Sequence, residues 1–462
     1  MKTIIKNGTV VTEKDCIQSD VLIEGETIKE VGAGINAEGA EVIDASGKLV
    51  LPGAVDVHTH MDLDVGFTRA CDDFYTGTVA AAAGGTTTIV DHMAFGPALC
   101  DLWHQVEEYH RIADKKAVID YGFHGVLQER ADEEILSQMK EIADKEGITS
   151  FKLYLTYDQM LSDRDVFAVL KKAKEEGLLI PVHCENDGII FNLRNRFVKE
   201  GKTEAKYHPK SRPAEAEAEA VNRMLYLAEA AGEAPLYIVH LSSRKGLNEV
   251  LAARERGQAH FGVETCTQYL TLEDSLYEDP KEGLKAIMSP PLRKKEDAEA
   301  LWKALSEDML DVIATDHCPF TFKEQKQRGS EDFTKCPNGA PGVEERLPVI
   351  YSEGVGNGKI TLQQLVKYLS ANPARIFGLY PKKGVIAAGS DADIVLLDPE
   401  KERILTASEM HGAADYTCYE GMKLKGDIDL VMQRGKVIVR GREFTGAKGD
   451  GRYLKRGASS LA

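Results

Sequence analysis

Hydrophobic and polar positions divide the chain into three parts with different periods. In the first 50 residues, short β-type runs such as TIIKNGTVV and SDVLIEGETIKEVG alternate with turns, and their NG and EG steps are typical of hairpins. From about residue 55, short apolar runs alternate with stretches such as ADEEILSQMKEIADKEG, which repeat every 3.6 residues and end near glycine. After about residue 380 the β-type pattern returns. The pattern therefore predicts a strand–helix region between two β-rich ends.

The middle part contains eight candidate strands, which is the number that closes a parallel barrel. They are residues 54–60, 86–92, 118–125, 150–155, 179–185, 236–242, 260–266 and 311–317. Strands that alternate with helices indicate βαβ units and a parallel sheet. We therefore expect an α/β fold, with a (β/α)8 TIM barrel over residues 53–374 and a small β-sandwich domain that both termini form, from residues 1–52 and 375–445. Residues 446–462 are polar, and we expect them to be a C-terminal tail.

The composition narrows the functional class. The chain of 462 residues has 57 Lys and Arg against 74 Asp and Glu, a net charge of −17, which argues against a nucleic-acid partner. No apolar run reaches the roughly 18 residues that cross a bilayer, and residues 1–11 do not resemble a secretion signal. The eight cysteines are scattered without a CxxC pair and are typical of reduced cytosolic thiols. We expect a cytoplasmic protein that binds neither nucleic acid nor membrane.

Histidines gather at the ends of the predicted strands, where such barrels carry their chemistry. Seven of the 12 histidines lie there: His58, His60, His92, His124, His183, His240 and His317. His58 and His60 face the same way because residues i and i+2 share a strand face. A hydrogen-bonded core pair is the simpler interpretation, but four further strands also offer His or Asp, and neutral imidazole is the commonest transition-metal ligand. We therefore expect a metal site made by His58, His60, His183, His240 and Asp316.

Lys152 is the unusual member of these strand ends. It shares a strand face with Tyr154 and would point into a cationic site, where an ammonium is poorly solvated. Either a salt bridge neutralises the lysine, or its amine has taken up CO2 and become a carbamate. A carbamate is an anion with two oxygens, which could bridge two metal ions roughly 3.5–4 Å apart. The surrounding ligands favour the carbamate.

Nine motifs spread along the chain resemble those of one family. They are GAVDVHTH, GGTTTIVDH, SFKLYLTY, HCEN, YIVHLS, ETCTQYL, SPPLR, ATDHCPF and NGAPGVE. The chain resembles the amidohydrolase superfamily in its cyclic amidohydrolase branch, the hydantoinases and dihydropyrimidinases, and most of all the bacterial enzymes that act on D-phenylhydantoin. The similarity covers nearly the whole chain and implies two divalent metal ions, zinc first, with manganese or cobalt as alternatives. By this resemblance one ion would be held by His58, His60, Asp316 and N6-carboxylysine at Lys152, and the other by Lys152, His183 and His240.

The resemblance also implies a reaction. A hydroxide that bridges the two metals would attack the ring amide carbonyl, because bound metal lowers the pKa of water. Asp316 would take the proton of the hydroxide and pass it to the leaving nitrogen, although a plain helix cap or salt-bridge partner is the simpler role for it. Tyr157 would stabilise the oxyanion, although it could merely pack. Ser289 and Asn338 match positions that hold the cyclic amide through backbone groups.

Two features favour one substrate class within this branch. Dihydroorotases carry an arginine two residues after the HxH pair, and this chain has Asp62 there, which disfavours a carboxylated ring. The exocyclic pocket would come from residues 61–73 and 153–161, whose apolar side chains suit a bulky 5-substituent: Leu63, Val65, Phe67, Tyr154 and Leu161. We therefore expect hydrolysis of cyclic ureides, namely 5-substituted hydantoins such as D-phenylhydantoin and also dihydropyrimidines, to N-carbamoyl amino acids. A dihydropyrimidinase or an allantoinase is the alternative, and a non-catalytic assembly protein is a remote one because every expected ligand is present.

The remaining candidates have supporting roles in this interpretation. We expect His92 and His317 to orient ligands, and His124 to lie in the core or to do the same. Cys184 and Cys318 lie beside site residues, but no base is assigned to either thiol, so we expect small core fillers. Members of this branch are commonly homotetramers, and the polar tail could reach a neighbouring subunit.

Overall fold

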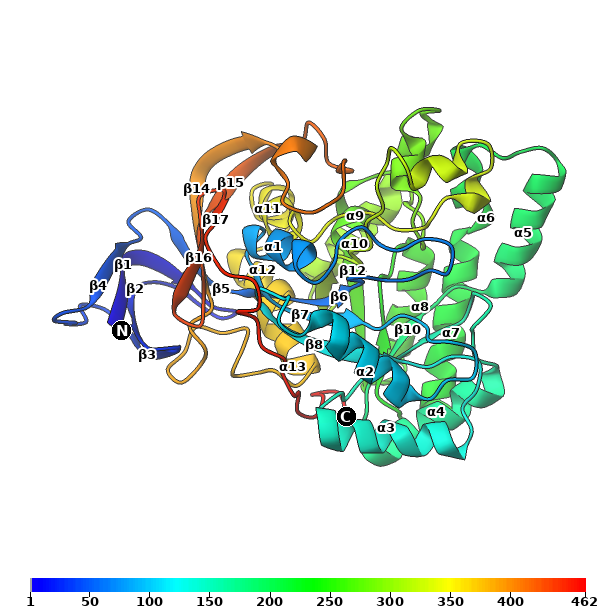
Figure 1. The fold of residues 1–462 in the computed structure, drawn as a ribbon, viewed down its shortest axis with the longest axis horizontal. Helices are drawn as coiled ribbons and strands as arrows, with labels where there is room; N and C mark the ends of the chain where they lie inside the picture. The colour runs from blue at the N-terminus through cyan, green and yellow to red at the C-terminus, as the bar shows by residue number, and fades with distance from the viewer. Residues whose placement is uncertain (1) are drawn as a thin grey trace.

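A parallel barrel forms the larger part of the molecule in the computed structural model, which describes residues 2–462 (Figure 1). Its eight strands follow one another in chain order. They are β6 (Ala54–Thr59), β7 (Thr86–His92), β8 (Asp120–Val126), β9 (Phe151–Tyr154), β10 (Ile180–His183), β11 (Leu236–Ile238), β12 (Phe261–Cys266) and β13 (Val312–Ala314). Each lies within or beside a predicted strand, so the expected fold class is confirmed.

The barrel closes where β6 meets β13. At the mouth, Thr59 and His317 form a parallel bridge, and the N–H of His60 donates to the carbonyl of His317 at 2.9 Å. Deeper in the barrel, the buried Arg346 donates to the carbonyl oxygens of Val55 at 3.0 Å and Ile313 at 3.1 Å. A guanidinium has five N–H donors, so one side chain joins two strands at this seam.

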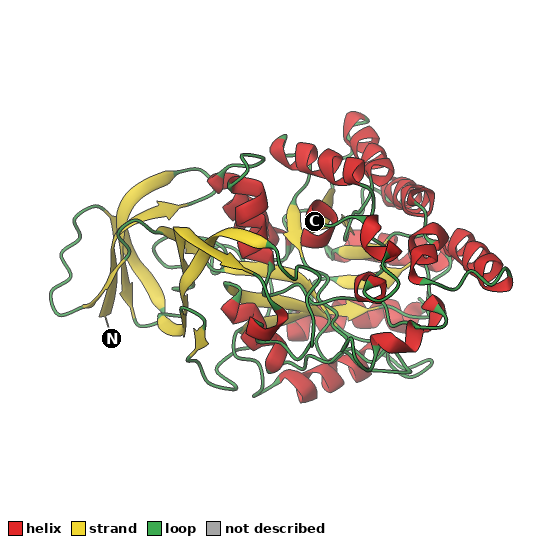
Figure 2. Ribbon diagram, turned by 90° about the horizontal axis from the view of Figure 1, so that it is seen from above, coloured by secondary structure: helices red, strands yellow, loops and turns green. Residues whose placement is uncertain are grey.

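Helices surround the barrel strands, and the small sheet lies to one side (Figure 2). The helices are α1 (Thr76–Ala83), α2 (Leu102–Ala113), α3 (Glu133–Glu146), α4 (Asp163–Glu176), α5 (Asp187–Lys199), α6 (His208–Ser211), α7 (Ala214–Ala230), α8 (Arg244–Glu255), α9 (Thr267–Thr271), α10 (Lys295–Ser306), α11 (Arg346–Ile350), α12 (Leu362–Val366) and α13 (Asn372–Ile376). The limits of α3 follow from its sequence, because Asp132 caps the N-terminus and Gly147 ends it with a φ of 66°. Among the described residues, no helix is long and apolar enough to cross a membrane.

The two termini build one separate mixed sheet. Its order is β17-β16-β15-β14-β5-β1-β2-β3, with β4 beside β1. Its strands are β1 (Lys2–Val11), β2 (Cys16–Glu24), β3 (Thr27–Gly32), β4 (Glu41–Asp44), β5 (Leu49–Pro52), β14 (Ile394–Ile404), β15 (Lys423–Gln433), β16 (Lys436–Arg440) and β17 (Glu443–Phe444). Residues from both ends of the chain, such as Ile5, Val21, Ile394 and Leu430, share a core distinct from that of the barrel. The exact domain limits given above stay a prediction.

Residues 446–462 lie across the base of the barrel, where the strands begin (Figure 1). Tyr453 forms a parallel bridge with Tyr121, and the N–H of Leu454 donates to the carbonyl of Tyr121 at 2.7 Å. Arg456 is buried and donates to the carbonyl of Phe123 at 2.6 Å and to Ser150 Oγ at 2.8 Å. The tail therefore packs on its own chain, because its polar groups satisfy the backbone at the barrel base. Contact of this segment with a neighbouring subunit stays a prediction.

Candidate metal centre

Three of the expected metal ligands meet at the barrel mouth. His58 and His60 come from the end of β6, and Asp316 follows β13. Asp316 Oδ1 lies 3.2 Å from His58 Nε2 and 3.1 Å from His60 Nε2, and one ligand atom of each residue lies within 4.8 Å of the others. Burial alone would raise the pKa of Asp316, but His58 and His60 outweigh it and lower that pKa to about 2. Asp316 is therefore an anion beside two imidazoles.

The other two histidines form a second pair next to the first. His183 ends β10 and His240 follows β11, and His183 Nδ1 lies 2.8 Å from His240 Nε2. The His240 ring also lies 5.4 Å from the His58 ring, measured between centroids. Burial lowers the pKa of both His183 and His240. Neutral imidazoles bind metals, so the two pairs offer adjacent half-sites.

Lys152 lies on β9 and is 1% exposed. No acidic side chain of residues 2–462 comes within 4.0 Å of its Nζ, so the structure offers no salt bridge to neutralise the lysine. Burial lowers the pKa of Lys152 to about 8. A lysine whose pKa is lowered has a larger neutral fraction near neutral pH than an exposed lysine, and the neutral amine is the form that combines with CO2. The environment therefore favours the carbamate interpretation over the salt-bridge one.

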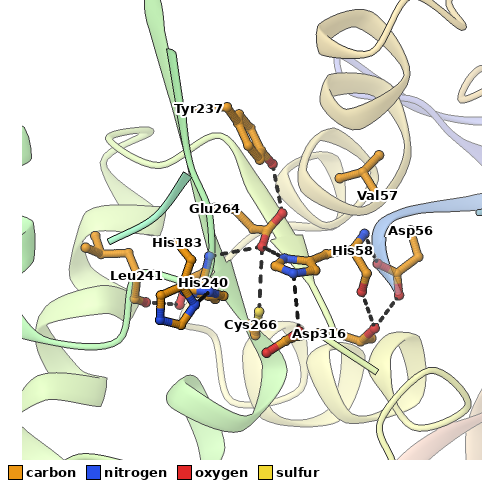
Figure 3. Close-up of polar contacts among 12 residues, drawn as sticks. Asp56, Val57, His58, His183, Tyr237, His240, Leu241, Glu264, Cys266 and Asp316 are labelled. Carbon is orange, nitrogen blue, oxygen red and sulfur yellow. Dashed lines mark hydrogen bonds and ion pairs between the residues drawn. The ribbon is translucent and has the colours of Figure 1, made fainter. Parts of the chain in front are cut away.

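Glu264, which sequence reasoning missed, supports both histidine pairs from β12 (Figure 3). Its Oε1 lies 2.6 Å from His58 Nδ1 and accepts from the backbone N–H of His240 at 3.0 Å. Its Oε2 accepts from the Tyr237 hydroxyl at 3.1 Å. Because Nδ1 of His58 donates to this carboxylate, its Nε2 presents a lone pair to the site. The sequence feature that could have indicated this role is an acidic residue, Glu264, within the apolar predicted strand HFGVETC.

Glu185 does the same for His183 and was also missed. Its Oε2 lies 2.8 Å from His183 Nε2, which leaves Nδ1 of that ring facing the site. Arg212 donates to both oxygens of Glu185, with its shortest contact at 2.6 Å. Burial raises the pKa of Glu185, but the Arg212 charge outweighs it and the pKa falls well below its usual range. The available signal was the HCEN motif, which places Glu185 two residues after a ligand.

Three residues of the site have left-handed backbone conformations. The φ angles are 80° for Tyr157, 40° for His240 and 54° for Asp316. L-residues other than Gly, Asn and Asp seldom adopt this region, and each instance costs of order 1–3 kcal/mol. The surrounding hydrogen bonds must hold these residues in place. Such strain concentrates at functional sites.

Of the three residues expected to bind substrate, Tyr157 lies beside this centre. The Tyr157 ring lies 5.6 Å from the His183 ring, and burial raises the pKa of the Tyr157 hydroxyl. Ser289 Oγ and Asn338 Oδ1 are buried without a hydrogen-bond partner in the described part of the chain. Their two segments touch, because the N–H of Gly339 donates to the carbonyl of Ile287 at 3.0 Å. The structure thus joins the Ser289 and Asn338 segments, which are far apart in sequence.

The remaining histidines of the strand ends have different surroundings. His317 Nε2 lies 3.1 Å from Asp72 Oδ2, and its Nδ1 accepts from the N–H of Gly342 at 3.1 Å. His124 Nδ1 lies 2.6 Å from Ser150 Oγ. His92 has no hydrogen-bond partner in residues 2–462, and its ring lies 4.2 Å from that of His124 and 4.5 Å from that of His58. His317 therefore ties the segment that follows β13 to Asp72 and Gly342, and His92 packs beside His58.

The two thiols beside the site are buried. Burial raises the pKa of Cys184 and of Cys318. A protonated thiol is a poor nucleophile and a poor metal ligand. The surroundings of both residues agree with core fillers.

The chain is similar to proteins of known activity over its whole length. Residues 49–438 match the Amidohydrolase family. The D-phenylhydantoinase of Escherichia coli (strain K12) is 48% identical over 457 residues, which cover 99% of this chain and 98% of that protein. The dihydropyrimidinase from Brevibacillus agri NCHU1002 superposes with a TM-score of 0.97 at 44% identity and covers 100% of both chains. The L-hydantoinase from Arthrobacter aurescens superposes with a TM-score of 0.89 at 29% identity, over 98% of this chain and 99% of that one.

Proposed function

The chain belongs to the amidohydrolase family, and from that premise we propose that it hydrolyses the ring amide of cyclic ureides. The preferred substrates are 5-substituted hydantoins such as D-phenylhydantoin, and the products are N-carbamoyl amino acids. The observation that carries the proposal is the arrangement of two histidine pairs and Asp316 at the barrel mouth, with an unpaired Lys152 on β9 between their strands. Relatives named for D-phenylhydantoin and dihydropyrimidines support the substrate class.

The donor set fits two divalent metal ions. His58 Nε2 is buried without a hydrogen bond in the described residues, and burial lowers the pKa of His58, which keeps its lone pair available. Imidazoles and carboxylates suit zinc, manganese or cobalt. Bound ions of this kind lower the pKa of water and polarise a carbonyl oxygen. We assign one ion to His58, His60, Asp316 and carboxylated Lys152, and the other to carboxylated Lys152, His183 and His240.

The side chains of this chain divide the remaining work. Asp316, an anion with its carboxylate at the centre, accepts a proton from the attacking water and delivers it to the ring nitrogen that leaves. Tyr157 keeps its proton because burial raises its pKa, so its hydroxyl can donate to the carbonyl oxygen as negative charge develops there. Ser289 and Asn338 have free polar groups that bind the ring amide. Their positions orient the scissile carbonyl.

Loops at the mouth suit an apolar 5-substituent. Leu63 and Val65 pack against a buried cluster of Ala70, Cys318 and Phe320. Tyr154 packs against Phe95, with 5.1 Å between ring centroids. Phe67 is 55% exposed, so an apolar ring is available at the entrance. Burying these groups against a phenyl substituent would add roughly 25 cal/mol for each Å² of apolar surface removed from water. This favours a phenylhydantoin over an unsubstituted ring.

The test compares the hydrolysis of D- and L-5-phenylhydantoin, dihydrouracil and allantoin, with zinc or manganese and bicarbonate supplied. A Lys152→Ala variant is the control. Fast turnover of D-phenylhydantoin that the variant lacks is the expected result. Turnover of dihydrouracil or allantoin alone would reassign the substrate within the same family. No turnover of any ring by metal-loaded protein would refute the proposal. We further expect a cytoplasmic homotetramer. Native mass spectrometry measures the number of subunits.

A further inference from the structure

Lys326 is a buried lysine that the reaction described above does not use. It is 0% exposed, and its Nζ donates to the carbonyl oxygens of Ile287 at 2.7 Å and Pro337 at 2.9 Å. Within residues 2–462 no acidic side chain lies within 4.0 Å of this nitrogen. A lysine is costly to bury without a counter-charge. The two carbonyls are therefore the contacts that keep it there.

These two carbonyls belong to the segments that carry the substrate-binding residues. Ile287 lies two residues before Ser289, and Pro337 lies directly before Asn338. No backbone carbonyl of the described chain accepts from the N–H of Ser289 or of Asn338. Lys326 thus adds a second link between two segments that the N–H of Gly339 already joins to the carbonyl of Ile287.

The hydrogen bonds from Lys326 to the two carbonyls also fix the direction of the N–H groups in the same peptide bonds. In a trans peptide the C=O and the following N–H point in opposite directions. Because the carbonyl of Pro337 points at Lys326, the N–H of Asn338 must point away from it. The same applies to the carbonyl of Ile287 and the N–H of Met288. On the other side, the carbonyl of Met288 accepts from His208 Nε2 at 2.7 Å.

We propose that Lys326 is a positioning residue that sets the separation and the peptide orientation of the Ser289 and Asn338 segments, so that both bind one cyclic amide. The inference rests on the proposed function and names the residue behind its substrate recognition. A ring with an –NH–CO–NH– edge needs donors and acceptors at fixed spacing. One ammonium on two carbonyls supplies that spacing, whereas an anchor on a single segment does not.

The experiment compares Lys326→Met with Lys326→Arg, which keeps donors at this position, and with Tyr277→Phe as the matched control. The Tyr277 hydroxyl donates to the carbonyl of Ala286 at 2.8 Å, so its loss loosens one segment only. We expect Lys326→Met to raise KM for D-phenylhydantoin about tenfold or more with kcat within about threefold. Lys326→Arg should recover part of the loss, and Tyr277→Phe should lower Tm with little change in KM. Metal content should equal that of the wild type in all three.

The outcomes separate this inference from the proposed function. An active wild type whose KM stays within about twofold in Lys326→Met, with only Tm lowered, would overturn the inference alone. A parallel loss of kcat and metal would also overturn it, because the lysine would then support the metal ligands. A wild type that hydrolyses no cyclic ureide would overturn both. If Lys326→Met does not fold, Lys326→Gln replaces it, since the shorter amide cannot reach both carbonyls.

Discussion

The two ends of the barrel bury charged groups in opposite ways. At the mouth, Lys152 has no acidic partner in the described chain, and His58 Nε2 makes no hydrogen bond there. At the base, the buried Lys383 lies 2.6 Å from Asp120, 2.9 Å from Asp391 and 2.8 Å from Asp393. A buried charge that its own chain satisfies contributes to the fold, whereas one left without a partner indicates a ligand. The mouth therefore has unpaired groups that a ligand can satisfy, whereas the chain itself satisfies the charges at the base.

The largest expected effect separates activity from stability at the mouth. Asp316→Asn removes the proton acceptor and one metal ligand while keeping the shape of the side chain. We expect kcat to fall by about 10²–10⁴-fold or more, because this is the usual contribution of a positioned acid or base. Tm should change little. Steady-state kinetics and a thermal melt on one preparation check this, and activity within tenfold of the wild type would contradict the role of Asp316.

The opposite result is expected at the base. Lys383→Met removes the cation that Asp120, Asp391 and Asp393 share. Arg434 still pairs with Asp120 in this variant. Breaking a buried ion pair on one side typically costs about 3–5 kcal/mol of the free energy of unfolding. Urea unfolding measures the loss, and kcat per folded molecule should stay at the wild-type value. A folded variant with normal stability and no activity would contradict this expectation, because Lys383 would then serve activity and not the fold.

A smaller effect concerns the carboxylate behind the metal ligands. Glu264→Gln keeps a hydrogen-bond acceptor near His58 Nδ1 but removes the charge, so the lone pair on Nε2 becomes less basic. Mutating such a partner typically lowers metal affinity about 10–100-fold. Competition with a chelator measures this without an activity assay. Unchanged metal affinity would mean that Glu264 supports the strands rather than the ligand.

The smallest effect concerns the loop that joins β14 and β15 of the small sheet. His411 Nδ1 donates to Glu344 at 2.9 Å, and Nε2 donates to the carbonyl of Arg442 at 2.8 Å. The bond to Glu344 raises the pKa of His411 above its usual 6.5. The stability from a raised pKa is complete below the unfolded value and is lost as pH rises through the folded one. The free energy of unfolding should therefore decline above pH 6.5 more steeply in the wild type than in His411→Asn, and equal slopes in urea titrations would refute the contribution.

Sequence patterns predicted the barrel strands and the inward histidines because both depend on local periodicity. A residue two positions along a strand faces the same side, which was enough to pair His58 with His60. Glu264 was not predictable in this way, since it lies 206 residues from His58, and Arg456 lies 306 residues from Ser150. Periodicity predicts the face of a strand or helix on which a residue lies. It does not predict which residue far away in sequence that side chain contacts. The packing of residues 446–462 was missed for the same reason. In the sequence, a polar residue that hydrogen-bonds to distant backbone looks the same as one that hydrogen-bonds to water.

The cover of the barrel base is synthesised after all eight barrel strands. Leu454 and Arg456 contact β8, and the carbonyl of Leu461 lies 3.0 Å from His260 Nδ1, just before β12. A ribosome-bound chain can therefore pair its strands and place its histidines before these contacts exist. Its base stays uncovered until the segment emerges from the exit tunnel. A stop codon before residue 450 would thus release a chain that has every expected metal ligand but lacks the segment that covers the barrel base.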